Sequence, residues 1–188
     1  MRESMSLSRF DGNGLEFDFL DGKLLSIVEK HHEKGIIPVE ELDEETALKL
    51  DFLKLAVPVK GSENSLAWIM RQFGSEMEIP YIIRFYFKFG KNWKKAILEY
   101  FRAIGEKDPE EFVDIFREVV ETSKNLIVCG EDIVDIAIKR GREPGAIISE
   151  LKGSGLISPT VGCGSFRKAK APLYEINRFF AILLKIEG

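Results

Sequence analysis

Residues 131–176 read EDIVDIAIKRGREPGAIISELKGSGLISPTVGCGSFRKAKAPLYEI, and this stretch decides the expected fold. Its first part repeats apolar residues at spacings of three and four, which predicts a short amphipathic helix that stops at Gly141. Pro144 suits the first position of a second helix, because its missing N–H would have no partner there. The apolar face of this second helix consists of Ile147, Ile148 and Leu151. Two helices joined by so short a turn predict a helix-turn-helix.

The sequence changes its period after the second helix, which we expect Gly153 and Gly155 to end. Residues 156–158 read as a strand, residues 159–172 as a loop rich in glycine and cations, and residues 173–176 as a returning strand. The resulting hairpin is the expected wing. Upstream, Asp108 and Pro109 predict the start of a preceding helix that runs to about residue 123. Residues 126–129 then supply a short first strand, so the C-terminal unit spans residues 108–188.

This unit resembles the winged helix-turn-helix superfamily. The resemblance rests on the motif Ile148-x-x-Leu151-x-x-x-Gly155-Leu156-Ile157 and on a hairpin that ends in Tyr174-x-Ile176. In that superfamily the second helix of the motif usually enters the DNA major groove, and the wing touches phosphates or the minor groove. Many winged helices bind proteins instead, so the resemblance implies a fold more specifically than a function.

Residues 15–75 show the same order of expected elements as the C-terminal unit. A helix over 15–33 precedes an extended step, a single helical turn at 39–42, a helix over 44–55, and a hairpin with strands at 56–60 and 65–70. Leu53-Lys54-Leu55 with Pro58 also resembles Gly155-Leu156-Ile157 with Pro159. These similarities indicate a diverged second copy of the unit. The alternative is a coincidence of common loop residues.

A connector over residues 76–107 joins the two units. Residues 80–89 are dense in aromatics, and their spacing fits a helix better than a strand, although alternation at Phe85, Phe87 and Phe89 is also present. A second helix is expected over 92–104. With residues 1–14 as a flexible N-terminus, the expected fold class is mainly α with small β-hairpin wings, in tandem winged-helix-like units joined by a helical segment.

Charge divides the two halves of the chain. The whole sequence has a net charge of −4, yet residues 124–188 hold 10 Lys/Arg against 7 Asp/Glu. The expected second copy begins its helices with Glu40, Glu41, Asp43, Glu44 and Glu45, which would repel phosphates. We therefore expect the C-terminal unit to meet DNA and the N-terminal part to mediate dimerisation or partner docking.

Seven residues are the candidate DNA contacts. Arg167, Lys168 and Lys170 place three cations at the wing tip, where each phosphate contact would release counterions. On the second helix, Ser149 could read a base edge and Lys152 a phosphate, beside Gly145, Ala146 and Glu150, which are also expected to face outward. Arg140 and Arg142 flank the turn. The alternatives are a solvated loop for the wing and compensation of a helix dipole for the two arginines.

The sequence contains no pattern typical of a catalytic, cofactor or metal site. Cys129 and Cys163 are isolated and are expected to be free thiols, and His31-His32 lacks metal-ligand spacing. No apolar run is long enough for a transmembrane helix, and the N-terminus lacks a secretory signal, so we expect a cytoplasmic protein. A single glutamine and abundant Glu, Lys and Ile are typical of thermophile composition.

The sequence therefore predicts a DNA-binding protein that is not an enzyme, with transcription regulation as the expected process. One expected partner is double-stranded DNA. The other is a second copy of the chain or another protein, bound through the N-terminal and aromatic segments. The rival hypothesis is a scaffold of paired winged helices that binds proteins without touching DNA. A third interpretation, stacking of single-stranded bases on the aromatics of residues 81–93, competes with simple burial of those rings in the core.

Overall fold

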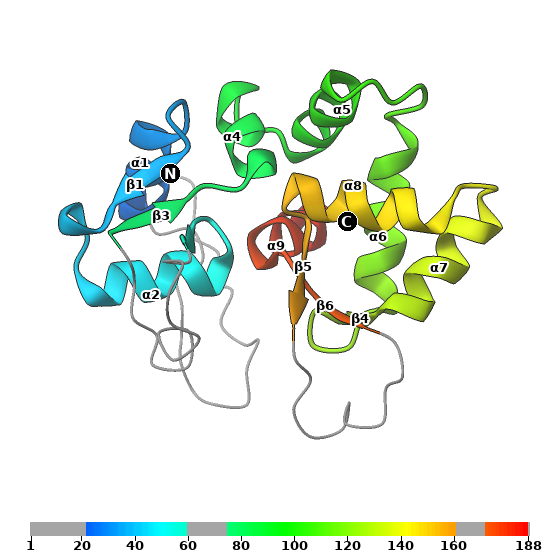
Figure 1. The fold of residues 1–188 in the computed structure, drawn as a ribbon. Helices are drawn as coiled ribbons and strands as arrows, with labels where there is room; N and C mark the ends of the chain where they lie inside the picture. The colour runs from blue at the N-terminus through cyan, green and yellow to red at the C-terminus, as the bar shows by residue number, and fades with distance from the viewer. Residues whose placement is uncertain (1–21, 60–74, 161–171, 188) are drawn as a thin grey trace.

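The computed structural model describes residues 22–59, 75–160 and 172–187, which form two units joined by a helical segment (Figure 1). The described chain is mainly helical and contains two small antiparallel sheets, each with three strands. The expected fold class is therefore confirmed. The expectations for residues 1–14, for the strand at 65–70 and for the wing tip lie outside the described residues.

The C-terminal unit has the expected order of helix, strand, two helices and hairpin. Its elements are α6 (Glu111–Thr122), β4 (Ile127–Cys129), α7 (Gly130–Lys139), α8 (Pro144–Ser154), β5 (Ile157–Thr160) and β6 (Leu173–Ile176). The strand order β4-β6-β5 places the first strand beside the returning strand of the hairpin. Pro144 occupies the first turn of α8, and Gly155 caps its end with a φ of 86°.

One boundary of this unit and its last helix differ from the sequence expectation. Helix α6 begins at Glu111 and not at Pro109, because the amides of Glu111 and Phe112 donate to the carbonyls only three residues back, at Asp108 and Pro109. That tighter turn precedes the regular helix. The chain also ends in a helix that the sequence pattern did not reveal, α9 (Arg178–Glu187).

The N-terminal unit repeats the same topology. Its elements are α1 (Gly22–His31), β1 (Ile36–Pro38), η1 (Val39–Glu41), α2 (Glu44–Leu53), β2 (Val57–Pro58), β3 (Glu76–Glu78) and α4 (Tyr81–Lys88). The order β1-β3-β2 matches that of the other sheet. Residues 76–78 were expected in the connector, but they pair with both β1 and β2 and close this sheet. Backbone pairing with strands distant in sequence overrides the local pattern there.

The aromatic segment that the sequence placed in the connector forms a helix, as expected, and this helix is α4 of the N-terminal unit. Ile82, Ile83, Tyr86 and Phe87 are the buried residues of α4, and this spacing follows a helical period. Helix α5 (Trp93–Ala103) follows after a short turn and is capped by Asn92, whose side chain accepts from the amide of Lys95. Helices α4 and α5 pack against each other along their buried faces.

Equivalent backbone hydrogen bonds show that the two units are copies of one arrangement. The amide of Ile79 donates to the carbonyl of Gly35, and the amide of Ile176 donates to that of Leu126, both at 2.8 Å. Gly35 and Leu126 both have positive φ angles, of 78° and 59°. A second pair joins Val39 to Ser75 at 3.0 Å and Gly130 to Pro172 at 2.8 Å.

The helix ends that precede the hairpins are also equivalent. The amide of Leu55 donates to Leu50 at 3.0 Å, and the amide of Leu156 donates to Leu151 at 3.1 Å. Lys54 and Gly155 occupy the same left-handed cap, at φ angles of 58° and 86°. Lys54 thus corresponds to Gly155, and Pro58 to Pro159. The sequence match that aligned Leu53 with Gly155 is therefore shifted by one residue.

The last helix of each unit packs on the other unit. By the same register, α4 corresponds to α9, because each follows the third strand of its sheet. Helix α4 contacts α8, and α9 contacts α2. The residues that precede α4 and α9 also contact the opposite unit. Pro80 lies so close to Gly155 that a methyl group there would be 2.6 Å from Pro80 Cβ, whereas Asn177 donates to the carbonyl of Lys54.

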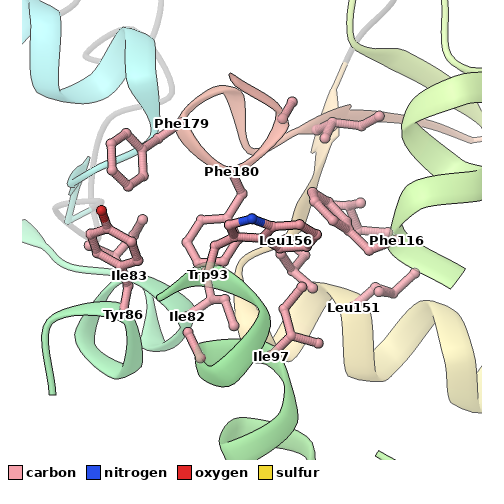
Figure 2. Close-up of a cluster of buried hydrophobic side chains, with 14 of the residues drawn as sticks. Ile82, Ile83, Tyr86, Trp93, Ile97, Phe116, Leu151, Leu156, Phe179 and Phe180 are labelled. Atoms are coloured by element: carbon pink, nitrogen blue, oxygen red, sulfur yellow. The ribbon is translucent and has the colours of Figure 1, made fainter. Parts of the chain in front are cut away.

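A continuous hydrophobic core runs through both units. Phe179 and Phe180 of α9 lie at its centre, between α4 on one side and α6 on the other (Figure 2). Tyr86 meets Phe179 edge to face with ring centroids 5.2 Å apart, and Phe116 meets Phe180 at 6.4 Å. The unexpected helix α9 is therefore what unites the core.

Asn177 holds this junction and provides a test of it. The residue is 1% exposed, and its Nδ2 donates to the carbonyls of Lys54 and Gly155, both at 3.1 Å. Its Oδ1 accepts from the amide of Phe180 and caps α9. We expect Asn177→Ala to lower the free energy of unfolding by about 2–4 kcal/mol, because it removes a cap and leaves two carbonyls without a partner. Urea denaturation measures this change.

Two comparisons isolate the contribution of the bonds between units. Asn92→Ala removes only a surface cap and should cost about 1 kcal/mol. Asn177→Asp keeps the oxygen that caps α9 but loses the donor, so it should destabilise at least as much as the alanine variant. An Asn177→Asp protein as stable as the wild type would show that the donors to Lys54 and Gly155 do not hold the units together.

Candidate nucleic-acid interface

Helix α8 presents a face of small residues to solvent. Its exposed residues are Gly145, Ala146, Ser149, Lys152 and Gly153. Ile147 and Leu151 anchor its opposite side in the core. Because all of these residues except Lys152 have a short side chain or none, another surface can approach the backbone of this helix closely. Ser149 and Lys152 thus face outward, as the helical period indicated, and Lys152 makes no ion pair within the described part of the chain.

The first amides of α8 are already occupied. Both oxygens of Glu143 accept from the helix start, one from Gly145 at 2.9 Å and the other from Ala146 at 2.5 Å. These two backbone hydrogen bonds lower the pKa of Glu143. A helix N-terminus commonly binds phosphate through such amides. Here a carboxylate of the protein takes that place, so contacts to a phosphate must come from side chains.

Arg140 and Arg142 are neutralised within the protein. Arg140 Nη2 lies 2.9 Å from Glu118 Oε2. Arg142 forms an ion pair with Glu106, lies 3.7 Å from Glu111 and covers the ring of Phe112. Both arginine side chains are only about a quarter exposed, at 24% and 22%. Their role in the structure is to tie the turn between α7 and α8 to α6, and a phosphate contact would require them to give up these partners.

The helical period predicted that Glu150 would face outward, but its side chain is only partly exposed. Burial, a hydrogen bond with the carboxyl of Glu106 and repulsion by its charge together raise the pKa of Glu150 to about 7, although Arg142 acts in the opposite direction. Arg142 lowers the pKa of Glu106, so the proton resides on Glu150. Glu150 Oε2 is buried and has no hydrogen-bond partner among the described residues. The carboxyl of Glu150 is therefore partly neutral at neutral pH, which reduces its repulsion of an anion on α8.

The aromatic helices flank α8, which the sequence did not reveal. Tyr100 Oη of α5 lies 3.4 Å from the position that a Cβ would take at Gly153. Tyr81 of α4 is 49% exposed, and its ring centroid is 6.3 Å from that of Tyr100. Gly153 was expected to end α8, but it lies inside the helix, and a Cβ at this position would make an ordinary van der Waals contact with Tyr100.

The remaining candidate residues lie outside the described part of the chain. Arg167, Lys168 and Lys170 belong to the segment between β5 and β6 that the structure does not describe. Cys129 is a free cysteine, whereas Cys163 falls in the same undescribed segment. Within residues 22–59, 75–160 and 172–187, no group of His, Cys, Asp and Glu could hold a metal ion. Over those same ranges, no helix has the length and apolar character needed to cross a membrane.

A family model matches residues 13–187 of the chain, and no function is attached to that family. The chain belongs to this family. The match covers both units and α9, so the tandem arrangement falls within the family model as a whole. No curated protein and no solved structure matches the chain.

The carboxyl pair beneath α8 predicts a pH dependence of stability. The pKa of Glu150 in the folded protein, about 7, lies above the ordinary glutamate value of 4.5. The folded state therefore holds this proton more tightly, and the resulting stabilisation is complete below pH 4.5 and lost as the pH rises to 7. We expect Glu150→Gln to match the wild type in urea midpoint near pH 5 and to exceed it near pH 8.

Glu131→Gln is the control for this prediction, because Glu131 is an exposed glutamate in the first turn of α7. Its difference from the wild type should not follow the same pH course. If the Glu150→Gln and wild-type midpoints change in parallel between pH 5 and pH 8, the raised pKa of Glu150 is wrong.

Proposed function

We propose that this protein binds double-stranded DNA through α8 and the hairpin formed by β5 and β6. The observation that carries the proposal is the exposed face of α8, on which small residues and Lys152 stand with no charged acid among them. The chain segment between β5 and β6 contains Arg167, Lys168 and Lys170. The topology of the unit and the resemblance of its sequence to winged helix-turn-helix proteins also support the proposal.

In the proposed mode, α8 lies in the major groove. The groove is about 12 Å wide and admits one α-helix. Ser149 is placed to bond a base edge or a phosphate, and Lys152 to contact a phosphate. The wing cations Arg167, Lys168 and Lys170 contact the backbone beside the groove. Arg140 and Arg142 act indirectly, because their ion pairs to α6 fix the start of α8.

Only one of the two copies carries such a surface. In the register that aligns Lys54 with Gly155, the positions of Gly145 and Ala146 on α8 are held by Glu44 and Glu45 on α2. Asp51 likewise corresponds to Lys152. Acidic residues at these positions repel phosphates. We infer that the N-terminal copy has lost, or never had, contact with DNA, so each chain reads a single site.

The sequence predicts dimerisation or partner docking for the N-terminal unit. In the structure α4 contacts α8 and α9 contacts α2, so the two units pack against each other within one chain. We propose that this internal packing replaces a symmetric dimer and orients α8. Transcription regulation remains the process we propose for such a DNA-binding protein.

Salt-dependent DNA binding tests the proposal. Fluorescence anisotropy with a random-sequence duplex at about 50 and 200 mM salt should show affinity that falls steeply with salt. Replacing Arg167, Lys168 and Lys170 together by alanine should reduce the slope of log K against log salt by up to about 2.7, since each phosphate contact contributes about 0.9. The variant should unfold at the same temperature as the wild type, because the three residues lie in a loop of the expected wing.

The control removes three charges elsewhere, by alanine at Lys30, Lys34 and Lys124. It should retain the wild-type slope. An equal loss in both triple variants would point to net charge alone, and the absence of duplex binding by the wild type at 50 mM salt would refute the DNA hypothesis.

The competing function is a protein-interaction scaffold. The observation that favours it is that Lys139, Arg140 and Arg142 all pair with carboxylates of the protein, so α7 and the turn that follows it offer no unpaired cation. A scaffold would show no salt-dependent DNA signal in the same anisotropy experiment, which separates the two functions.

A further inference from the structure

Two lysines at the corner between α4 and α5 are held over aromatic rings. Lys88 Nζ lies 5.5 Å from the ring centroid of Phe89 and 5.7 Å from that of Phe85. Lys95 Nζ lies 5.7 Å from the same Phe89 ring. Both lysines are exposed, and within the described part of the chain neither forms an ion pair. Their neighbour Lys91, by contrast, pairs with Glu29 at 2.9 Å.

This corner is connected to α8 by a row of aromatic contacts. Tyr100 touches the position of Gly153 on α8, and its ring centroid is 5.5 Å from that of Phe85. Phe85 in turn lies 5.6 Å from Phe89. In Figure 1, α4 and α5 lie along the side of α8 opposite to strands β5 and β6. The helices that carry the two lysines and the hairpin thus lie on different sides of α8.

A helix in the major groove has a phosphate backbone on each side of it, because the groove is only about 12 Å wide. The expected wing serves one of these backbones. On the opposite side, the described surface of the α4–α5 corner offers Lys88 and Lys95, whose ammonium groups are restrained by the rings beneath them. A restrained side chain loses less conformational entropy when it binds, which favours its use as a phosphate contact.

We propose that Lys88 and Lys95 form a second phosphate-binding site for the same duplex that α8 contacts. This inference rests on the proposed function. It adds a contact to the DNA phosphate backbone on the side of α8 opposite the wing. A single strand with bases stacked on the aromatic segment fits less well. The ring of Phe89 is already approached by two ammonium groups of the protein, so a stacked base would have to displace them.

The test is the double variant Lys88→Gln and Lys95→Gln. Glutamine removes the charge but keeps a flexible polar stem, so the aromatic rings stay covered and the unfolding temperature should not change. In duplex-binding anisotropy, the slope of log K against log salt should fall by up to about 1.8, at about 0.9 for each phosphate contact. Arginine at both positions should restore the wild-type slope, because it preserves the charge and also stacks on aromatic rings.

The matched control is glutamine at Lys30 and Lys34, which removes the same charge from α1 and the turn that follows it. This control should bind the duplex with the wild-type slope. A wild type that binds duplex, with an unchanged slope in the Lys88/Lys95 variant, would overturn the second site and leave the proposed function standing. A wild type that binds no duplex would overturn both.

A single-stranded oligonucleotide of the same length completes the experiment. We expect the Lys88/Lys95 variant to lose affinity for the duplex. A loss confined to the single strand would overturn the inference as stated, because it would assign the corner to unpaired bases.

Discussion

The side chain of Asn177 joins the two halves of this protein at one point. It donates to the carbonyls that end α2 and α8, at Lys54 and Gly155, and its own backbone amide donates to Leu156. Because Asn177 is buried, its polar atoms cannot bond to water, and each of them needs a partner within the protein. These hydrogen bonds fix the direction in which α9 leaves β6, and so they place Phe179 and Phe180 at the centre of the core.

The reciprocal arrangement explains how two small units reach a common core. A unit of this size buries little surface alone, and each adds its last helix to the other. The same arrangement explains why Gly155 is required at one cap while Lys54 suffices at the other. Pro80 leaves no space for a Cβ at Gly155, whereas Asn177 meets the carbonyl of Lys54 and not its side chain.

Some charged side chains of the C-terminal unit pair with other side chains of the protein, and others are exposed to solvent. The arginines nearest to α8 are used internally, and the acid at Glu150 is turned inward and partly neutralised. What remains on the outer face of α8 is small and weakly cationic, with Lys152 on the helix and Lys88 and Lys95 to one side. The proposed binding of duplex DNA rests on this distribution of charge.

The sequence by itself determined the elements whose signals are local: the apolar period of α8, the proline that starts it, the glycine that ends it and the hairpin that follows. It also indicated the repeated unit, although one residue out of register. The tertiary structure alone decided the partners of Arg140, Arg142 and Glu150, the place of β3 in its sheet and the role of α9. Each of these depends on residues far apart in the chain, and a side chain that looks free in the sequence is free only if folding brings no opposite charge beside it.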